Sequence, residues 1–215
     1  KKVLRDKIYN LPIIEAFPHM LKSKACDGEI GIEIECEGTH LFNAPISYWR
    51  VEKDGSLRVV DGGEPIEYVL RKPLSRSDVT KALNYLSKKL KEAGSNVADS
   101  TRTSVHVHLN CQALSMKQII QLWCLYVVFE ELLVNFSGPD REGNLFCLRA
   151  KDAEHAVQTL EQGLKTESYN DIFSENLRYT SCNTASLSKF GSLEFRSMRG
   201  TVDQGLIQLW IDILC

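Results

Sequence analysis

The sequence lacks the patterns that mark several common classes of protein. Its seven cysteines form no CxxC pair and no regular framework, which favours reduced thiols over a disulfide scaffold or a zinc knuckle. Its 26 basic and 28 acidic residues give a formal net charge of −2, so we expect no general electrostatic attraction to nucleic acid. Reduced thiols indicate a reducing compartment, and we expect a cytoplasmic protein.

Signals for export or membrane insertion are also missing. The polar start at Lys1–Arg5 is followed by no stretch that reads as a signal peptide or a membrane span, so we expect no association with membranes. Residues 206–215 keep an apolar helical pattern without a capping glycine, which leaves open that the natural chain continues beyond Cys215. With 43% hydrophobic residues in 215, we expect one domain over 1–215 with an N-terminal extension at 1–28.

The usual nucleotide-binding loops are absent. Neither GxxxxGK[ST] nor GxGxxG occurs in the chain, and these loops hold phosphates in the P-loop and dinucleotide-binding folds. Any nucleotide would therefore have to be held by a metal ion and by polar side chains on a sheet.

Alternating residues predict strands in the first half of the chain. Residues 29–37 place isoleucines on one face and glutamates on the other, which is the period of a strand. Asp54-Gly55 indicates a hairpin turn between two further short strands. Short connections of this kind favour an antiparallel meander, with strands expected at 47–51, 57–60 and 66–70.

Helical spacing of apolar residues predicts helices between the later strands. The expected helices run from a cap at Ser77 to Gly94, from Ser115 to Phe136, from about Asp152 to Leu164, and from about Asp203 onward. A strand is expected at 104–110, and a hairpin is expected from 178–187 and 192–198. The order of elements predicts an α+β fold with a largely antiparallel sheet backed by helices. The helix from Ser115 is apolar on nearly every side, so it should lie in the core or against a partner subunit.

Three expected strands carry pairs of ionisable side chains on one face. The pairs are Glu33 with Glu35, His106 with His108, and Glu194 with Arg196, and residues two apart on a strand share a face. If these strands are neighbours, their polar faces line one cleft. Carboxylate oxygens suit Mg²⁺ or Mn²⁺, and an arginine can offset the charge of a transferred phosphate.

Each pair taken alone also fits an ordinary surface. Alternating glutamates on a strand are most often a solvated face, and an isolated HxH is more often an exposed or hydrogen-bonded pair than a ligand set. Arg196 alone would fit a salt bridge. The chemical interpretation depends on the three pairs occurring together.

The order of the motifs resembles the amidoligases of phages and bacteria, which are relatives of glutamine synthetase and γ-glutamylcysteine ligase. The resemblance runs from about Gly31 to Trp210. It is carried by Gly31-Ile-Glu-Ile-Glu35, Asp54-Gly-Ser-Leu57, Glu67-Tyr-Val69, His106-Val-His108, Arg178-Tyr179 with Asn183, Glu194-Phe-Arg196 and Gly200-Thr201. It implies a glutamine synthetase-like catalytic fold and an ATP- and Mg²⁺-dependent carboxylate–amine ligase, with Mn²⁺ as an alternative ion.

The resemblance also implies a role for each matching residue. Glu33, His106 and Glu194 match the ligands of a metal ion that bridges the phosphates, and Glu35 and Glu67 match those of a second ion. His108 matches a contact to the nucleotide phosphates, and Arg196 matches the residue that stabilises the phosphoryl group during transfer. Arg178 and Arg199 match clamps for substrate or phosphate. Asp54 lies in a turn expected at the substrate mouth and is our candidate for the base that takes the amine proton.

Several alternatives stay open at this stage. Glu64 and Glu67 both fit one metal position, and we choose Glu67 because Tyr68-Val69 follows it. The segment 138–149, with Arg141, Asn144 and Cys147, also resembles the phage members and suggests only substrate binding. A metal-dependent hydrolase or a non-catalytic binding module of the same fold could carry similar residues.

The expected reaction has no named substrates. It would join a small-molecule carboxylate to an amine through an acyl phosphate, and the substrates could be an amino acid, a peptide or a modified nucleotide. A phage-encoded protein would work in the host cytoplasm. A homo-oligomer is compatible with the apolar helix at 115–136.

Overall fold

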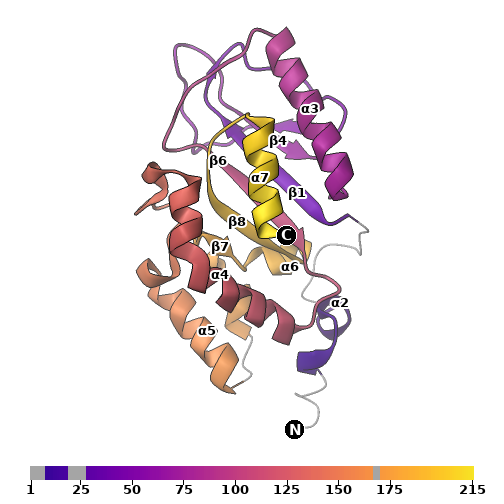
Figure 1. Cartoon of the computed structure of the whole chain (residues 1–215), viewed down its shortest axis with the longest axis vertical. Coiled ribbons are helices and arrows are strands. Elements are labelled where there is room, and N and C mark those ends of the chain that lie inside the picture. Colours follow the sequence, from indigo (N-terminus) through magenta and orange to yellow (C-terminus); the bar gives the residue numbers. More distant parts are fainter. Residues whose placement is uncertain (1–7, 19–27, 167–169) are drawn as a thin grey trace. The chain divides into compact units, whose positions relative to one another are not determined.

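The computed structural model describes residues 8–18, 28–166 and 170–215 (Figure 1), and the chain forms two compact units. One unit combines Asp27–His108 with Ser197–Cys215, and the other combines Lys1–Cys26 with Leu109–Arg196. We call the first the carboxylate unit and the second the helical unit. The expectation of one catalytic domain over the whole chain stays a prediction.

The strands form a six-stranded sheet in the order β3-β4-β1-β6-β8-β7 and a two-stranded sheet of β2 and β5. The pairings of β1 with β4, of β3 with β4 and of β7 with β8 are antiparallel. This confirms the expected mixture of helices with a largely antiparallel sheet. The strands are β1 Ile30–Cys36, β2 Gly38–Thr39, β3 Trp49–Glu52, β4 Ile66–Leu70, β5 Asn96–Val97, β6 Ser104–Asn110, β7 Cys182–Asn183 and β8 Ser192–Arg199.

Helices are interspersed among the strands along the chain. The α-helices are α2 Ile13–Ala16, α3 Arg76–Glu92, α4 Met116–Ser137, α5 Glu154–Thr166, α6 Ser186–Phe190 and α7 Gln204–Leu214. Short 3₁₀ helices are η1 Pro139–Arg141, η2 Ala150–Asp152, η3 Asn170–Phe173 and η4 Glu175–Leu177.

In the carboxylate unit, one face of the strands packs on helices. Ile32 and Ile34 of β1 are buried, and the Trp49 indole N–H of β3 donates to the Ala82 carbonyl of α3 at 3.0 Å. Helix α3 in turn contacts α7. Because successive side chains point to opposite faces, burying the isoleucines against helices turns Glu33 and Glu35 to the other face.

In the helical unit, α4 and α5 lie side by side (Figure 1). Ser115 and Gln118 form a capping box at the start of α4, which fixes where the helix begins. Trp123 and Tyr126 are buried, and the Tyr126 ring lies 5.1 Å from that of Phe195 on β8. Among the described residues, α4 alone is long and apolar enough to cross a membrane by length and composition, and 33% of its apolar window is buried.

Three local predictions were wrong. Residues 57–60 do not form a hairpin strand, because the Arg58 N–H donates to the Glu37 carboxylate at 2.7 Å and β3 pairs instead with β4. Helix α3 is capped by Ser75 rather than Ser77, since the Ser75 hydroxyl accepts from the Asp78 N–H. Within 178–187 only Cys182–Asn183 is a strand, because the Asn183 side chain accepts from the Ala185 N–H at 2.9 Å and the chain turns into α6.

The described part of the expected N-terminal extension packs into the helical unit. The Ile13 N–H donates to the Leu114 carbonyl at 2.8 Å, and Ile13 is fully buried. The Phe17 and Phe173 rings meet edge to face at 5.6 Å. Residues 8–18 are therefore part of the packed structure of this unit.

Candidate metal centre

A row of carboxylates crosses three strands on the polar face of the carboxylate unit. Glu52 of β3 lies opposite Glu67 of β4, and Glu67 lies opposite Glu35 of β1. Directly opposed residues on neighbouring strands have Cβ atoms about 5 Å apart, and like charges in such pairs repel. This row is therefore unfavourable unless protons or cations reduce its charge.

Glu35, Glu67 and His106 form a set that could hold a metal ion. One possible ligand atom from each side chain lies within 4.8 Å of the others. Burial, together with the charges first of Glu33 and Glu35 and then of Asp54 and Glu52, raises the pKa of Glu67 to about 8. A divalent cation would offset the same repulsion, and the two carboxylates of this set suit Mg²⁺ or Mn²⁺.

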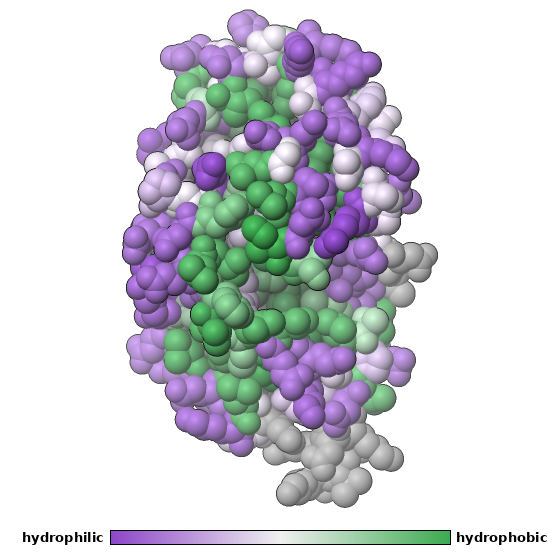
Figure 2. Space-filling model, viewed as in Figure 1, coloured by the Kyte–Doolittle hydropathy of each residue, from purple (hydrophilic) through white to green (hydrophobic). Residues whose placement is uncertain are grey.

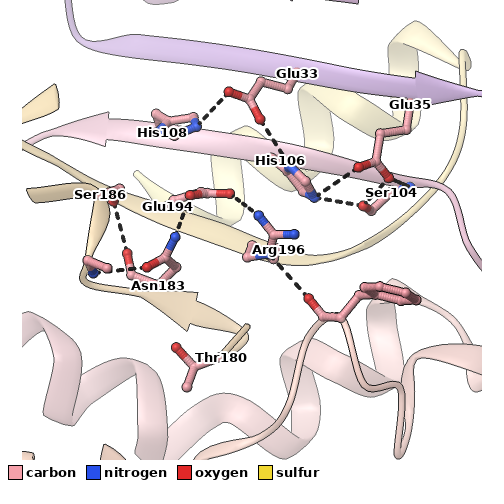
Figure 3. A network of polar contacts seen from close by, with 12 residues as sticks. Glu33, Glu35, Ser104, His106, His108, Thr180, Asn183, Ser186, Glu194 and Arg196 are labelled. Carbon is pink, nitrogen blue, oxygen red and sulfur yellow. Dashed lines mark hydrogen bonds and ion pairs between the residues drawn. The ribbon is translucent and has the colours of Figure 1, made fainter. Parts of the chain in front are cut away.

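A chain of hydrogen bonds joins this set to the rest of β1 and β6 (Figure 3). The Ser104 N–H and Oγ lie 2.8 and 2.6 Å from Glu35 Oε2. Ser104 Oγ lies 2.7 Å from His106 Nε2, and His106 Nδ1 lies 3.0 Å from Glu33 Oε2. Both imidazole nitrogens are thus engaged, so the ring orientation of His106 is fixed by its neighbours.

Glu33 lies between two histidines. Its second oxygen, Oε1, is 3.3 Å from His108 Nε2. Burial alone would raise the pKa of Glu33, but the charge and hydrogen bonds of His108 and His106 outweigh it and lower the pKa well below the usual value. Glu33 is therefore an anion at neutral pH, which is the form that binds a cation.

Strands β1 and β6 lie antiparallel, because later residues of β1 contact earlier residues of β6. A Cβ placed on Gly31 would lie 3.2 Å from that of His108, while Glu33 contacts His106 and Glu35 contacts Ser104. This antiparallel register brings each glutamate of β1 beside a polar side chain of β6. The absence of a side chain at Gly31 leaves space beside His108.

The turn that contains Asp54 is stabilised by the side chain of Arg102, which follows α3 in the sequence. Asp54 Oδ1 accepts from the Ser56 N–H at 2.7 Å, and the Arg102 guanidinium donates to the Ser56 carbonyl through Nε at 3.0 Å and Nη2 at 2.5 Å. The Asp54 charge also contributes to the raised pKa of Glu67. Asp54 is therefore electrostatically coupled to the carboxylate row.

A second polar group lies in the helical unit, on β7 and β8 (Figure 3). Glu194 Oε2 accepts from Asn183 Nδ2 at 2.6 Å, and the other carboxylate oxygen accepts from Arg196 Nη1. Arg196 Nε also donates to the Phe146 carbonyl at 3.2 Å. The guanidinium is held at two points, so its direction is set by the loop and by Glu194 together.

Arg141 supports the same part of β8 from the segment 138–149. Its side chain is almost completely buried, and its Nη2 donates to the Arg196 carbonyl at 2.9 Å. Arg178, in contrast, is exposed and stacks over the Tyr179 ring at 5.6 Å. Cys147 is buried, and burial raises the pKa of its thiol, so it is a poor candidate for a nucleophile.

Within each unit, some of the predicted site residues lie close together and others do not. In the carboxylate unit, Glu33, Glu35, Glu67, His106 and His108 belong to one connected cluster. Glu64 is exposed and contacts Asn43 at 3.1 Å, which favours Glu67 for the ambiguous position. Arg199 lies at the end of β8 and is half-buried.

Two residues without an expected role belong to these groups. Ser104 joins Glu35 to His106, and it could have been found because it shares a strand face with His106, two residues away. The Phe146 carbonyl contact to Arg196 has no such signal, because a backbone acceptor can come from any residue type.

The description "putative amidoligase enzyme" belongs to the family model that matches residues 43–215. This match covers most of the chain. The chain belongs to this amidoligase family. The match confirms the family expected from the motifs and supports an enzyme that forms amide bonds, whereas no curated protein matches the chain. The matched part of this amidoligase includes Glu67, His106, Glu194 and Arg196.

Proposed function

We propose that this amidoligase is an ATP- and Mg²⁺-dependent carboxylate–amine ligase that forms an amide through an acyl phosphate and releases ADP and phosphate. The observation that carries the proposal is the approach of Glu35, Glu67 and His106 within the carboxylate unit. A row of acidic groups with one pKa raised to about 8 is expected where cations bind.

The ligands divide into two sets under this proposal. Glu35, Glu67 and His106 would hold one ion, and the family resemblance assigns Glu33, His106 and Glu194 to a second ion that would act on the nucleotide phosphates. Bound divalent ions would neutralise phosphate oxygens and withdraw charge from the bond that breaks. His108 is assigned to the nucleotide phosphates, and its contact with Glu33 would orient its ring.

Arg196 would stabilise the phosphoryl group during transfer to the substrate carboxylate. Its guanidinium is anchored by Nε and Nη1, which fixes the plane of the remaining N–H groups. A pre-oriented donor stabilises charge that develops in the transition state without reorganising. Arg178 and Arg199 would contribute positive charge for substrate or phosphate, and Asp54 would take the proton of the attacking amine. The acyl phosphate then reacts with the amine, so no protein nucleophile is required.

Isotope transfer tests the acyl phosphate directly. The protein is incubated with ATP, Mg²⁺, amines and carboxylic acids labelled with ¹⁸O in the carboxylate, and the products are analysed by mass spectrometry. We expect ADP, a new amide and phosphate that carries one ¹⁸O atom from each carboxylate. Stoichiometric AMP and pyrophosphate would contradict the phosphoryl-transfer mechanism, and hydrolysis without ATP would favour a metal-dependent hydrolase.

A matched pair of variants links this activity to the candidate metal centre. Glu67→Gln should abolish turnover, because it removes a ligand charge from the carboxylate row. Glu64→Gln should leave turnover unchanged, because Glu64 is exposed and paired with Asn43 and Lys53. Equal activity of the two variants would remove Glu67 from the proposed site.

A further inference from the structure

One face of α4 carries an exposed apolar stripe. Five of its side chains are exposed to solvent by 43% (Leu122), 55% (Leu125), 75% (Val128), 48% (Phe129) and 67% (Leu132). Figure 2 shows this part of the surface as an apolar area over α4. The opposite face of the helix is buried, so the stripe is additional to the surface that packs the helical unit.

The stripe has the spacing of a helix–helix seam. Leu122, Leu125, Phe129 and Leu132 are separated by three, four and three residues, which is the spacing of the a and d positions of a heptad repeat. The separations of three, four and three residues are the same whether the helix is read from its N-terminal or its C-terminal end. A stripe of this kind can pair with an identical stripe that runs the opposite way, as a two-fold symmetric interface requires.

The helix dipoles of α4 favour the antiparallel orientation. Two parallel copies would place like ends of the dipoles side by side, whereas an antiparallel pair brings the N-terminal end of each helix beside the C-terminal end of the other.

The size of the stripe is sufficient for a weak dimer. An aromatic side chain buries roughly 150–250 Å² and an aliphatic one less, so these partly exposed residues offer at most on the order of 500 Å² on one copy. Two copies would cover about 1,000 Å², which is the lower limit for a specific interface. Gln121 and Asn135, which are exposed beside the stripe, could add hydrogen bonds at its edges.

We infer that α4 forms an antiparallel, two-fold symmetric interface with α4 of a second copy of this chain. Leu122 packs against the partner's Leu132, and Leu125 packs against the partner's Phe129. Val128 lies at the edge of this seam, near its middle. This inference does not depend on the reaction proposed above.

Oligomeric state gives the first test. Light scattering coupled to size-exclusion chromatography should give the mass of a dimer for the wild-type chain at high micromolar concentration. Leu125→Glu should give a monomer with unchanged far-ultraviolet circular dichroism, and the matched variant Leu209→Glu, on the exposed face of α7, should stay dimeric. A monomeric wild-type protein, or a monomer from Leu209→Glu alone, overturns the inference.

Crosslinking tests the orientation without a disruptive variant. Cys26, which lies outside the described residues, and Cys124 and Cys215, which are not buried, are changed to serine. A mixture of Leu122→Cys and Leu132→Cys chains should then form a disulfide-linked dimer, whereas each alone should not, because equivalent positions are about 15 Å apart along the helix axis. Crosslinking of each variant with itself would indicate a parallel pair and contradict the inference. Binding of the wild-type chain to phosphatidylcholine vesicles that Leu125→Glu abolishes would assign the stripe to a membrane instead.

Discussion

Glu67 shows how neighbouring strands change the chemistry of one carboxyl group. Its pKa rises from the ordinary value of 4.5 to about 8, first because it is buried and then because Glu33 and Glu35 lie nearby. Glu64, three residues earlier, is exposed and lies outside the carboxylate row. The difference follows from strand pairing, since only Glu67 lies opposite Glu35.

The raised pKa of Glu67 predicts a pH-dependent stability of the metal-free protein. The folded state binds this proton more tightly than the unfolded chain, so its stabilising contribution is full below about pH 4.5 and declines as pH rises towards about 8. In EDTA, the melting temperature should therefore fall over this range. Glu67→Gln should lack this component and melt higher than wild type at the upper end, while Glu64→Gln should follow wild type. A Glu67→Gln curve parallel to that of wild type would contradict the prediction.

Arg196 allows a test that separates three roles. Arg196→Lys keeps a positive charge but loses the planar group that contacts both Glu194 and the Phe146 carbonyl. We expect ATP to bind with nearly unchanged affinity and the saturated rate to fall by a factor on the order of a hundred. A lower melting temperature with an intact rate would indicate a structural role. A rate within about threefold of wild type would remove Arg196 from the mechanism.

At the scale of elements, the start of α3 depends on one serine. Ser75 has extended backbone angles and accepts a hydrogen bond from the Asp78 N–H, as an N-cap does. Ser75→Ala should lower the free energy of unfolding by about 1 kcal/mol, and Ser77→Ala should change it by less than about 0.5 kcal/mol. Urea denaturation of both variants measures this, and equal losses would mean that Ser75 does not cap the helix alone.

The segment 138–149 acts on β8 through a buried arginine. Arg141→Met would remove the buried guanidinium that donates to the Arg196 carbonyl. The free energy of unfolding should fall by about 1–3 kcal/mol, and the saturated rate should fall further than the loss of folded protein explains. The exposed variant Arg178→Met should show less than about 0.5 kcal/mol of destabilisation. Unchanged stability in Arg141→Met would show that this contact is dispensable.

At the scale of the whole molecule, metal binding should be coupled to pH. Ligand carboxylates must be deprotonated to bind a cation, so Mg²⁺ should raise the melting temperature more at pH 8 than at pH 6. Thermal unfolding followed over a Mg²⁺ titration measures this, because a ligand that binds only the folded state stabilises it. The increase should be much smaller in Glu67→Gln. An equal effect of Mg²⁺ at both pH values would argue against carboxylates as ligands.

The local periodicity of the sequence determined much of the fold. Alternation placed Glu33 with Glu35 and His106 with His108 on single strand faces, and helical spacing located α4 and α7 to within a few residues. These features depend on side chains that are close in sequence, so a short segment of the sequence is enough to predict them. The combination of motifs also identified the amidoligase family, while the two-metal mechanism stays a prediction.

Only the tertiary structure decided which segments meet. The sequence allowed residues 57–60 as the partner of β3 and Glu64 as an alternative to Glu67, whereas the folded chain pairs β3 with β4 and brings Glu67 beside Glu35. Ser104 and the Phe146 carbonyl gained their contacts in the same way. The physical reason is that strand pairing and buried hydrogen bonds join residues that are far apart in the chain. Which of the possible partners pair depends on the burial of the whole core and not on any local pattern.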